Sequence, residues 1–553
     1  MCGIWGYVAR TNHLGVAQLF EAFGRVQPRG PDRSDFRQFN EIARIYLGFH
    51  RLAIMDRGVG GDQPFVLDHN GHSIVVICNG EIYNHRELEQ ANQIQVTSGS
   101  DCEFLPHMYR IHGTDMFARL RGEFGICVVD MDRTNSQINI WIARDMGGVR
   151  PVFFGADSNG LGFSSTLAGL HGIIEPSQTR QLERAQIIGI CVGANGIETS
   201  KSIYHRLDTI GTRVYEPDTL YQTIRETLIG AVHCRLESDL PVGALLSGGL
   251  DSSLVCAIAS RFVGLRGQRL RTFSIGIDGS TDREYAVMVS EHCQTIHTHI
   301  EFTQAEFLEA LEQTVRVTET YDITTIRASV GQYLISRWIR QNTDIRVLLI
   351  GDGSDELCGG YMYFHNAPTP IDAHHENIRL LKTIQYFDTL RADRCIASNG
   401  IEARVPFLDQ RFVELYLSLD PVLRVPRVEH MGGRRVEKWL LRKAFDVDGY
   451  LPDLVLWRKK EAFSDGVSSC EKSWYTVIQE NVKDLYTDEA IGQINPIVQI
   501  GQIIPPTREA LHYKVLYSKY FDPRVQVIPY YWLPRWSGDS NEPSARVLQV
   551  YQS

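Results

Sequence analysis

The sequence predicts an α+β N-terminal region of antiparallel sheets packed with helices, followed by an α/β region with a parallel sheet and a helical C-terminal part. Three observations lead to this prediction. Short strand patterns fill residues 1–205 without regular alternation with helices, as in antiparallel sheets covered by helices. From residue 221, strand and helix patterns alternate, which is typical of a parallel sheet with helices on both faces. Residues 375–485 have mainly helical patterns.

Runs of alternating apolar residues predict the strands of the first region. The strands are expected at Gly3–Arg10, Ile45–Ile54, Ser73–Ile77, Phe124–Asp130, Ile138–Arg144 and Val152–Gly155, with helices at Val16–Val26 and Glu103–His112. Residues 207–220 have mixed polarity and contain Gly211 and Pro217, as expected of a linker. We therefore predict a first domain at residues 2–205, a linker at 206–220 and a second domain at 221–553.

The second region is predicted to alternate strands with helices. Its strands are expected at 240–246, 270–277, 295–302 and 345–350, and its helices at 221–236, 252–263, 283–293, 304–318 and 328–341. The last fifty residues contain Pro505, Pro506, Pro523, Pro529, Pro534 and Pro543. They are predicted to wrap irregularly over the surface.

The composition argues against several classes of protein. Of the 553 residues, 43% are hydrophobic and 22% are charged, as in a soluble globular protein. The net charge of −10 argues against nonspecific nucleic-acid binding, which needs a basic face. The 11 cysteines lack Cys-x-x-Cys spacing, which argues against a disulfide framework and a zinc site. No apolar run approaches the ~18 residues of a membrane span and no signal peptide is seen, so a cytoplasmic protein is expected.

One glycine-rich turn marks the predicted nucleotide site. The apolar run Leu240–Leu246 predicts a buried strand, Ser252–Val263 predicts a helix, and Ser247–Ser253 joins them. Adjacent glycines let the backbone approach an anion, and the helix start offers free N–H groups to it. Asp251 can hold a metal ion that bridges phosphate oxygens. The turn lacks the Walker pattern Gly-x-x-x-x-Gly-Lys and resembles the PP-loop of ATP pyrophosphatases.

Cys2 is the second point of chemical interest. If Met1 is removed, Cys2 carries a free α-amine, and its ordinary pKa of about 8 leaves a fraction neutral and able to act as base toward the thiol. The segments Arg29–Asp32, His50–Leu52, Asn79–Asn84 and Ser100–Asp101 follow in order. Together with Cys2 they resemble the class II glutamine amidotransferases, whose domain is of the Ntn-hydrolase type.

This resemblance implies a role for each residue of the set. Cys2 would attack the side-chain amide of glutamine, while Asn79 and the N–H of Gly80 form the oxyanion hole. Arg51 would bind the carboxylate of glutamine in bidentate fashion. Glu81 and Asp101 would bind its ammonium group.

Further blocks accompany the PP-loop in the second region. They are Glu319–Ser329, Gly351–Tyr361, Gly400–Asp409, Arg458–Gly466, Tyr531–Trp536 and Pro543–Arg546. With the N-terminal set they resemble the glutamine-hydrolysing asparagine synthetases, in particular their eukaryotic branch, over essentially the whole chain.

The same resemblance implies the residues of the second site. The ATP-binding residues would be Leu246, Ser247, Gly248, Gly249, Leu250, Asp251, Ser252, Ser274, Ile275, Ile350, Gly351 and Lys460. Asp251 and Asp355 would hold Mg²⁺, and Arg327 would stabilise charge on the leaving pyrophosphate. Asp388 and Lys438 would help to hold aspartate.

The implied enzyme is an ATP-dependent ligase with two half-reactions. Glutamine is hydrolysed to glutamate and ammonia, and the β-carboxylate of aspartate attacks ATP to give β-aspartyl-AMP and pyrophosphate. Ammonia then passes through the interior, protected from protonation by water, and converts the intermediate into asparagine. The expected partners are glutamine, aspartate, ATP and Mg²⁺, without nucleic acid or membrane. A homodimer is compatible with the resemblance.

The chain departs from the family pattern beside the predicted nucleotide. The family usually has Ser-Gly-Glu-Gly where this chain has Ile350-Gly351-Asp352-Gly353. Ile350 lacks a hydrogen-bonding group, and Asp352 replaces the glutamate expected to accept the ammonia proton. Two alternatives stay open: a PP-loop amidotransferase with a different carboxylate acceptor, because only the resemblance indicates aspartate, and a catalytically impaired regulatory homologue, which Ile350 and Asp352 support. β-Lactam synthetases share the PP-loop but do not need Cys2.

Overall fold

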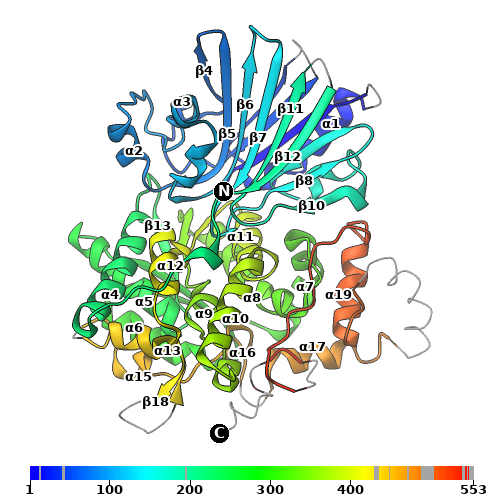
Figure 1. Cartoon of the computed structure of the whole chain (residues 1–553). Coiled ribbons are helices and arrows are strands. Elements are labelled where there is room, and N and C mark those ends of the chain that lie inside the picture. The colour runs from blue at the N-terminus through cyan, green and yellow to red at the C-terminus, as the bar shows by residue number, and fades with distance from the viewer. Residues whose placement is uncertain are drawn as a thin grey trace.

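The computed structural model describes residues 1–11, 14–39, 44–193, 196–428, 435–447, 449–469, 472–486, 503–538, 542–544 and 546. In Figure 1 the sheets of the N-terminal half lie above a half in which helices surround a sheet, and the N-terminus lies between the halves. Among the described residues, no helix combines the length and apolar character that a membrane crossing requires. The predicted fold class is confirmed, since antiparallel sheets precede a parallel one.

Two six-stranded antiparallel sheets form the N-terminal half. The first has the order β10 (Thr179–Gln181), β8 (Phe153–Ala156), β9 (Gly160–Ser164), β1 (Gly3–Ala9), β3 (Ile45–Arg51) and β2 (Arg33–Phe39). The second has the order β12 (Gly196–Ile203), β11 (Gln186–Gly193), β7 (Gln137–Arg144), β6 (Gly122–Asp132), β5 (His72–Ile82) and β4 (Phe65–His69). The helices α1 (Val16–Gly24), α2 (His85–Ala91) and α3 (Leu105–His112) complete this half.

Alternation along β1 explains how the sheets stack. Successive side chains of a strand point to opposite faces. Ile4 and Val8 therefore enter the core between the two sheets, while Trp5 and Tyr7 belong to the core that contains Phe23 of α1. Another core covers the outer face of the second sheet and includes residues of α3. The N-terminal half thus has two helical layers around two sheets.

A five-stranded parallel sheet organises the second half. Its order is β15 (Ile296–Phe302), β14 (Arg271–Ile277), β13 (Val242–Leu245), β16 (Val347–Leu349) and β17 (Glu402–Arg404). The chain proceeds outward from β13 to β15 and then returns to the other side of β13 as β16. The order therefore reverses between β13 and β16, which is where ligands bind in open parallel sheets.

Helices cover this sheet, as the alternation predicts. They include α4 (Pro217–Cys234), α5 (Leu250–Leu265), α6 (Asp282–His292), α7 (Gln304–Thr318), α8 (Ile323–Asn342) and α11 (Asp388–Ala397). Helix α4 begins inside the predicted linker, because proline is favoured in the first turn of a helix. Helix α8 begins five residues before the prediction, because the Asp322 side chain accepts from the Thr325 N–H at 2.9 Å and caps it.

The C-terminal part is mainly helical, as predicted. It contains α9 (Ser354–Cys358), α10 (Pro370–Thr383), α12 (Gln410–Leu417), α13 (Pro421–Arg424), α14 (Trp439–Ala444), α15 (Asp453–Leu456), α16 (Phe463–Gly466), α17 (Trp474–Val482) and α19 (Arg508–Ser518), with the two-stranded ribbon β18 (Arg427–Val428) and β19 (Arg435–Val436).

The prediction of an irregular surface wrap over the last fifty residues is wrong where helix α19 forms, whereas residues 519–538 are irregular as predicted but partly buried. Helix α19 lies within that segment. Tyr531 and Trp532 are buried, and the ring of Trp532 lies 5.1 Å from that of Tyr361, so aromatic packing draws the segment inward. The rest of the predicted wrap lies outside the described residues.

Candidate active site

A cavity of about 170 Å³ opens where the order of the parallel sheet reverses. The loop after β13 and the loop after β16 both contribute to its wall. The wall includes the predicted ATP residues Leu246, Ser247, Gly249, Asp251, Ser252, Ser274, Ile275, Ile350, Gly351 and Lys460. The structure therefore brings together ten residues that come from four separate parts of the chain.

The loop after β13 is shaped by one glycine and two hydroxyls. Gly248 has φ +76°, and a Cβ there would lie 2.5 Å from the backbone nitrogen of Ala286, so only glycine fits. The hydroxyls of Ser247 and Ser252 are 3.1 Å apart, and the Ser252 hydroxyl also bonds the Gly249 carbonyl at 3.2 Å. Gly248 thus shapes the loop, and neither Gly248 nor Leu250, both predicted to bind ATP, lines the cavity.

Two aspartates and two lysines meet beside this loop. The ammonium group of Lys438 lies 2.7 Å from Asp251 and 2.5 Å from Asp355, and that of Lys460 lies 2.6 Å from Asp355. Burial would lower the pKa of Lys438, but the two carboxylates outweigh burial and raise it. Lys438 is buried and does not line the cavity, whereas Lys460 does. The predicted metal ligands Asp251 and Asp355 therefore both contact Lys438, and Lys460 also lies 3.7 Å from Asp251.

Asp352 and Asp388 line the same cavity, and both bind Arg391, a residue that the sequence analysis missed. Arg391 of α11 donates to Asp352 at 2.7 Å and also binds Asp388. Burial raises the pKa of Asp352, and Arg391 opposes that rise. The sequence did contain a signal for this contact: Arg391 follows Asp388 by three residues in a helical pattern, and such positions lie on the same face of a helix.

The structure does not bring Arg327 into the cavity. Its guanidinium binds Glu509 through Nε at 2.8 Å and Nη2 at 2.6 Å, and it also binds Glu542. Burial would lower its pKa, but Glu509 and Glu542 outweigh burial and raise it. Arg327 is thus held by the C-terminal part of the chain, and its role toward pyrophosphate stays a prediction.

Cys2 lies at the start of β1, between the two halves of the molecule. Its Sγ accepts from the Leu52 N–H at 3.4 Å and lies 3.7 Å from the Leu52 carbonyl oxygen. Arg29 Nε donates to the Cys2 carbonyl at 3.1 Å. With Met1 in place, burial raises the pKa of the Cys2 thiol to about 11 and lowers that of the Met1 α-amine to about 6.

Asn79 and Gly80 lie on β5, at the edge of this site. The Ser165 hydroxyl accepts from Asn79 Nδ2 at 3.4 Å and from the Ile4 N–H at 3.0 Å, so it ties Asn79 to β1. Within the described part of the chain, the buried Oδ1 of Asn79 has no hydrogen-bond partner. A Cβ at Gly80 would lie 1.9 Å from the Glu123 carbonyl oxygen, so only glycine fits against β6.

The predicted glutamine-binding residues are buried and already have partners. Arg51 donates to Asp62 at 2.5 Å and to the Gly58 carbonyl at 2.6 Å. Asp101 accepts from the Ile82 N–H at 2.7 Å, and Glu81 lies 3.2 Å from Arg404. Burial raises the pKa of both acids. Asp62, which sequence reasoning missed, competes with any substrate carboxylate for Arg51.

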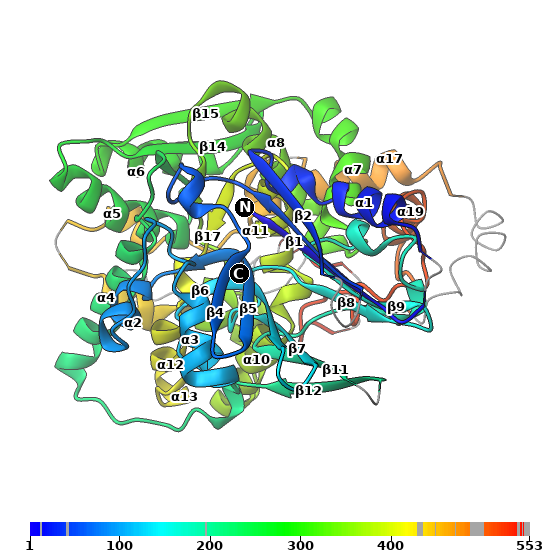
Figure 2. The same ribbon diagram turned by 90° about the horizontal axis from the view of Figure 1, so that it is seen from above.

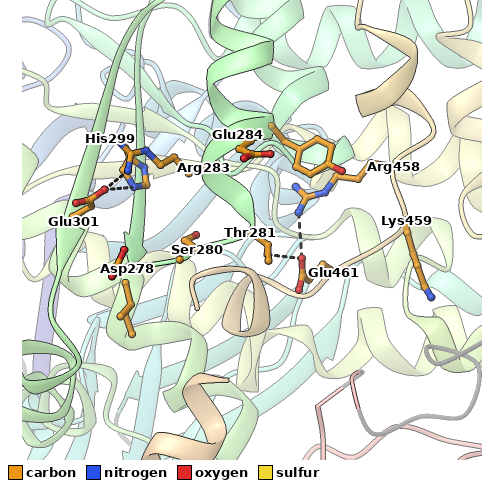
Figure 3. A pocket seen from close by; sticks show the side chains of 13 residues that line it. Asp278, Ser280, Thr281, Arg283, Glu284, His299, Glu301, Arg458, Lys459 and Glu461 are labelled. Carbon is orange, nitrogen blue, oxygen red and sulfur yellow. Dashed lines mark hydrogen bonds and ion pairs between the residues drawn. The ribbon is translucent and has the colours of Figure 1, made fainter. Parts of the chain in front are cut away.

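A larger cavity of about 620 Å³ lies beside the cavity at the sheet reversal (Figure 3). It contains none of the predicted site residues and shares only Glu461 with the smaller cavity. Its polar groups bind one another: Glu461 accepts from Thr281 at 2.7 Å and lies 3.2 Å from Arg458. No group of three or more His, Cys, Asp or Glu side chains able to hold a metal ion occurs among the residues that the structure describes.

The chain is similar to known proteins over its whole length. The chain matches a family model described as asparagine synthase over residues 223–376 and 368–495, and one described as a glutamine amidotransferase domain over residues 1–219. It is 36% identical to the asparagine synthetase (glutamine-hydrolyzing) of Gallus gallus, over 100% of this chain and 99% of that protein. It is 37% identical to a probable asparagine synthetase (glutamine-hydrolyzing) of Acanthamoeba polyphaga mimivirus, over 100% of both chains. The Homo sapiens asparagine synthetase (glutamine-hydrolyzing) is 36% identical, over 100% of this chain and 99% of that protein.

Proposed function

The chain belongs to the glutamine-hydrolysing asparagine synthetases, an ATP-dependent ligase family, and on that premise we propose that it makes asparagine from aspartate, ATP and glutamine. We assign glutamine hydrolysis to residues 2–205 and asparagine formation to residues 221–553. The observation that carries the proposal is the cavity at the sheet reversal, where the glycine-rich loop, Asp251, Lys460 and Asp352 meet.

The glycine-rich loop supports phosphate binding in the first half-reaction. The N-terminus of α5 and the hydroxyls of Ser247 and Ser252 offer donors to the phosphates of ATP. Lys460 adds positive charge where pyrophosphate leaves. Asp388, at the cavity wall, is proposed to contact aspartate, and Lys438 to act from behind the wall by holding Asp251 and Asp355.

Asp251 and Asp355 fit a magnesium ion. Both carboxylates converge on the Lys438 ammonium group, so both already face one cation. Mg²⁺ is commonly held by one or two carboxylates together with substrate phosphates, which agrees with a site of only two acidic side chains. When bound, the ion supplies positive charge to the phosphate oxygens as pyrophosphate departs.

Asp352 is proposed to accept the proton that ammonia loses on attacking β-aspartyl-AMP. Its carboxylate lies at the cavity wall, and Arg391 favours its charged, proton-accepting form. Aspartate is one methylene shorter than the glutamate usual in the family. The Arg391 contact at 2.7 Å supports a loop arrangement that fits the shorter side chain.

Glutamine hydrolysis is proposed to require prior removal of Met1 from the chain. Cys2 then carries the α-amine, and burial favours the neutral form of an amine at this place, as the lowered pKa of the Met1 amine indicates. A neutral amine can take the thiol proton as Cys2 attacks the amide. Asn79 Nδ2 and the Gly80 N–H would then stabilise the developing oxyanion.

Release of pyrophosphate tests this proposal. The purified protein with ATP, Mg²⁺, aspartate and glutamine is expected to form asparagine, AMP, pyrophosphate and glutamate in equal amounts. Replacing aspartate by other amino acids that carry a carboxylate tests the acceptor. Faster pyrophosphate release with another acceptor would contradict the assignment of aspartate, and no release with any acceptor would contradict catalysis by this site.

A further inference from the structure

Helix α11 contacts both sites through neighbouring side chains. Arg391 donates to Asp352 at 2.7 Å and lines the nucleotide cavity. Two residues later, Asp393 accepts from Arg29 through Nη1 at 2.6 Å and Nη2 at 3.2 Å. Side chains two apart on a helix differ by about 200° around its axis, so α11 presents one residue to each side. Figures 1 and 2 both place the N-terminus next to α11.

Arg29 continues the connection to the predicted nucleophile. While Nη1 and Nη2 bind Asp393, Nε donates to the Cys2 carbonyl at 3.1 Å. Arg29 is 3% exposed and Asp393 is 1% exposed, so water does not compete for these contacts. The connection thus runs from Asp352 to Arg391 by a hydrogen bond, along the backbone of α11 to Asp393, and then by hydrogen bonds through Arg29 to the Cys2 carbonyl.

The Asp393 end of this connection is firmly held. Arg150 lies 3.3 Å from the Asp393 carboxylate and 3.0 Å from Glu123 of β6. Burial alone would raise the pKa of Asp393, but Arg29 and Arg150 outweigh burial and lower it, so the carboxylate stays charged. A buried bidentate pair between charged groups fixes geometry as well as distance. A movement of α11 would therefore move Arg29.

The Arg391 end can respond to substrates. Arg391 binds the carboxylates of Asp352 and Asp388, and both line the cavity with it. The phosphates of ATP and the carboxylates of aspartate are anions that compete with these two residues for Arg391. Substrates would thus bind more tightly to one arrangement of α11 than to another, which is the condition for coupling between sites.

We propose that Asp393 is a positioning residue that holds Arg29 against the Cys2 carbonyl, so that filling the ATP and aspartate cavity changes the rate of glutamine hydrolysis through α11. The inference rests on the proposed function, because it assigns hydrolysis to Cys2 and ATP to the cavity. Asp393 does not line the cavity and acts only by placing Cys2.

The test compares two buried aspartates that bind arginines across the two halves. Asp393→Asn keeps the shape of the side chain and removes its charge. Asp409→Asn is the matched control, since Asp409 binds Arg121 and Arg235 at 2.9 and 2.8 Å but does not contact the residues that hold Cys2. Glutamate release is measured with and without ATP, Mg²⁺ and aspartate, and asparagine synthesis is measured with ammonium chloride.

For Asp393→Asn we expect glutamate release to fall at least about tenfold through kcat, with little change in KM, because a small displacement of a nucleophile costs much of its rate. The effect of ATP and aspartate on glutamate release should disappear, and ammonia-dependent synthesis should stay within about twofold of wild type. Asp409→Asn should keep that effect, and Asp393→Glu should recover part of the rate.

A second measurement needs no variant. Carbamidomethylation of Cys2 by iodoacetamide, followed by mass spectrometry, should change in rate when ATP, Mg²⁺ and aspartate are added to the wild-type protein. An unchanged rate, or equal loss of hydrolysis and ammonia-dependent synthesis in Asp393→Asn, would overturn the inference. Failure of the proposed function looks different, because the wild-type protein would then release no glutamate or no aspartate-dependent pyrophosphate.

Discussion

Arg404 of β17 lies 3.2 Å from Glu81 of β5, which joins the parallel sheet to the predicted glutamine site. Arg404 also binds Glu402 at 2.7 Å, and its carbonyl accepts from the Ile350 N–H at 3.1 Å. Burial and the nearby Asp101 raise the pKa of Glu81 well above its ordinary value, while Arg404 lowers it. Arg404 therefore favours the charged form that could bind the ammonium group of glutamine.

Removing the positive charge of Arg404 is expected to weaken glutamine binding in a pH-dependent way. In Arg404→Gln, Glu81 is protonated over a wider pH range, so KM for glutamine should rise about tenfold near neutrality and fall again as pH increases and Glu81 ionises. Initial rates of glutamate release between pH 6.5 and 8.5 measure this effect. Arg411→Gln, which removes an exposed pair with Glu87 at 3.4 Å, is the control. A pH-independent KM in Arg404→Gln would contradict the role of Glu81.

Cys2→Ala is expected to separate the two half-reactions. Synthesis with glutamine should be lost, whereas synthesis with ammonium chloride should stay within about twofold of wild type, because the second cavity lies on other elements. A non-cleavable N-terminal extension should act like Cys2→Ala, since it turns the α-amine of Cys2 into an amide. Glutamine-dependent asparagine formation by Cys2→Ala would show that another group is the nucleophile.

Asp251→Asn is expected to reduce ATP–pyrophosphate exchange by at least about 100-fold, because an amide is a weaker Mg²⁺ ligand than a carboxylate. Raising the Mg²⁺ concentration should recover part of the loss, and glutamate release should persist. Asp278→Asn, in the larger cavity, is the control and should leave exchange unchanged. Normal exchange by Asp251→Asn at low Mg²⁺ would argue against the metal role.

Substitutions of Asp352 test how the shorter acid works. Asp352→Ala should abolish asparagine formation with either nitrogen donor, while glutamate release and β-aspartyl-AMP formation persist. Asp352→Glu should be about tenfold slower than wild type, because the longer side chain would displace the Arg391 contact. Higher activity in Asp352→Glu would mean that the natural residue impairs the site. Normal synthesis by Asp352→Ala would rule out proton acceptance at this position.

Two histidines beside Ser274 are expected to make the folded protein less stable in acid. The Ser274 hydroxyl lies 3.0 Å from His297 Nε2 and 2.7 Å from His299 Nδ1. Burial, with a contribution from His299, lowers the pKa of His297 to about 4. Above pH 6.5 the His297 side chain is mostly neutral in both the folded and the unfolded state. Between pH 6.5 and 4 this side chain binds a proton more readily in the unfolded state. Stability should therefore fall by roughly 2 kcal/mol over this range.

Thermal unfolding checks this prediction. The Tm of the wild-type protein should fall between pH 7 and 5 by more than that of His297→Gln, which cannot take up the proton. An equal fall in both proteins would show that other groups cause the acid sensitivity.

The elements that position the cavity at the sheet reversal could be predicted because their sequence signals are local. An apolar run, a glycine turn and an apolar helix follow one another at Leu240–Val263, and the structure has β13, the loop and α5 there. Strand β17 was missed because it has three residues and no alternation, and its burial comes from neighbours remote in sequence.

The placement of single side chains could not be predicted in this way. Arg327 lies in a recognisable block, but its partners Glu509 and Glu542 are 182 and 215 residues away. Lys438 reaches Asp251 across 187 residues, and Arg391 of α11 reaches Asp352 in the turn between β16 and α9. Such contacts depend on how distant elements pack, which short patterns do not contain.

Transfer of oxygen from aspartate to AMP tests the central claim most directly. The protein is given ATP, Mg²⁺, glutamine and aspartate that carries ¹⁸O in its β-carboxylate, and the products are analysed by mass spectrometry. Attack of that carboxylate on the α-phosphate predicts AMP with one ¹⁸O atom, unlabelled pyrophosphate, and asparagine that retains the other ¹⁸O. Unlabelled AMP, or ADP with labelled phosphate, would contradict activation of aspartate as β-aspartyl-AMP.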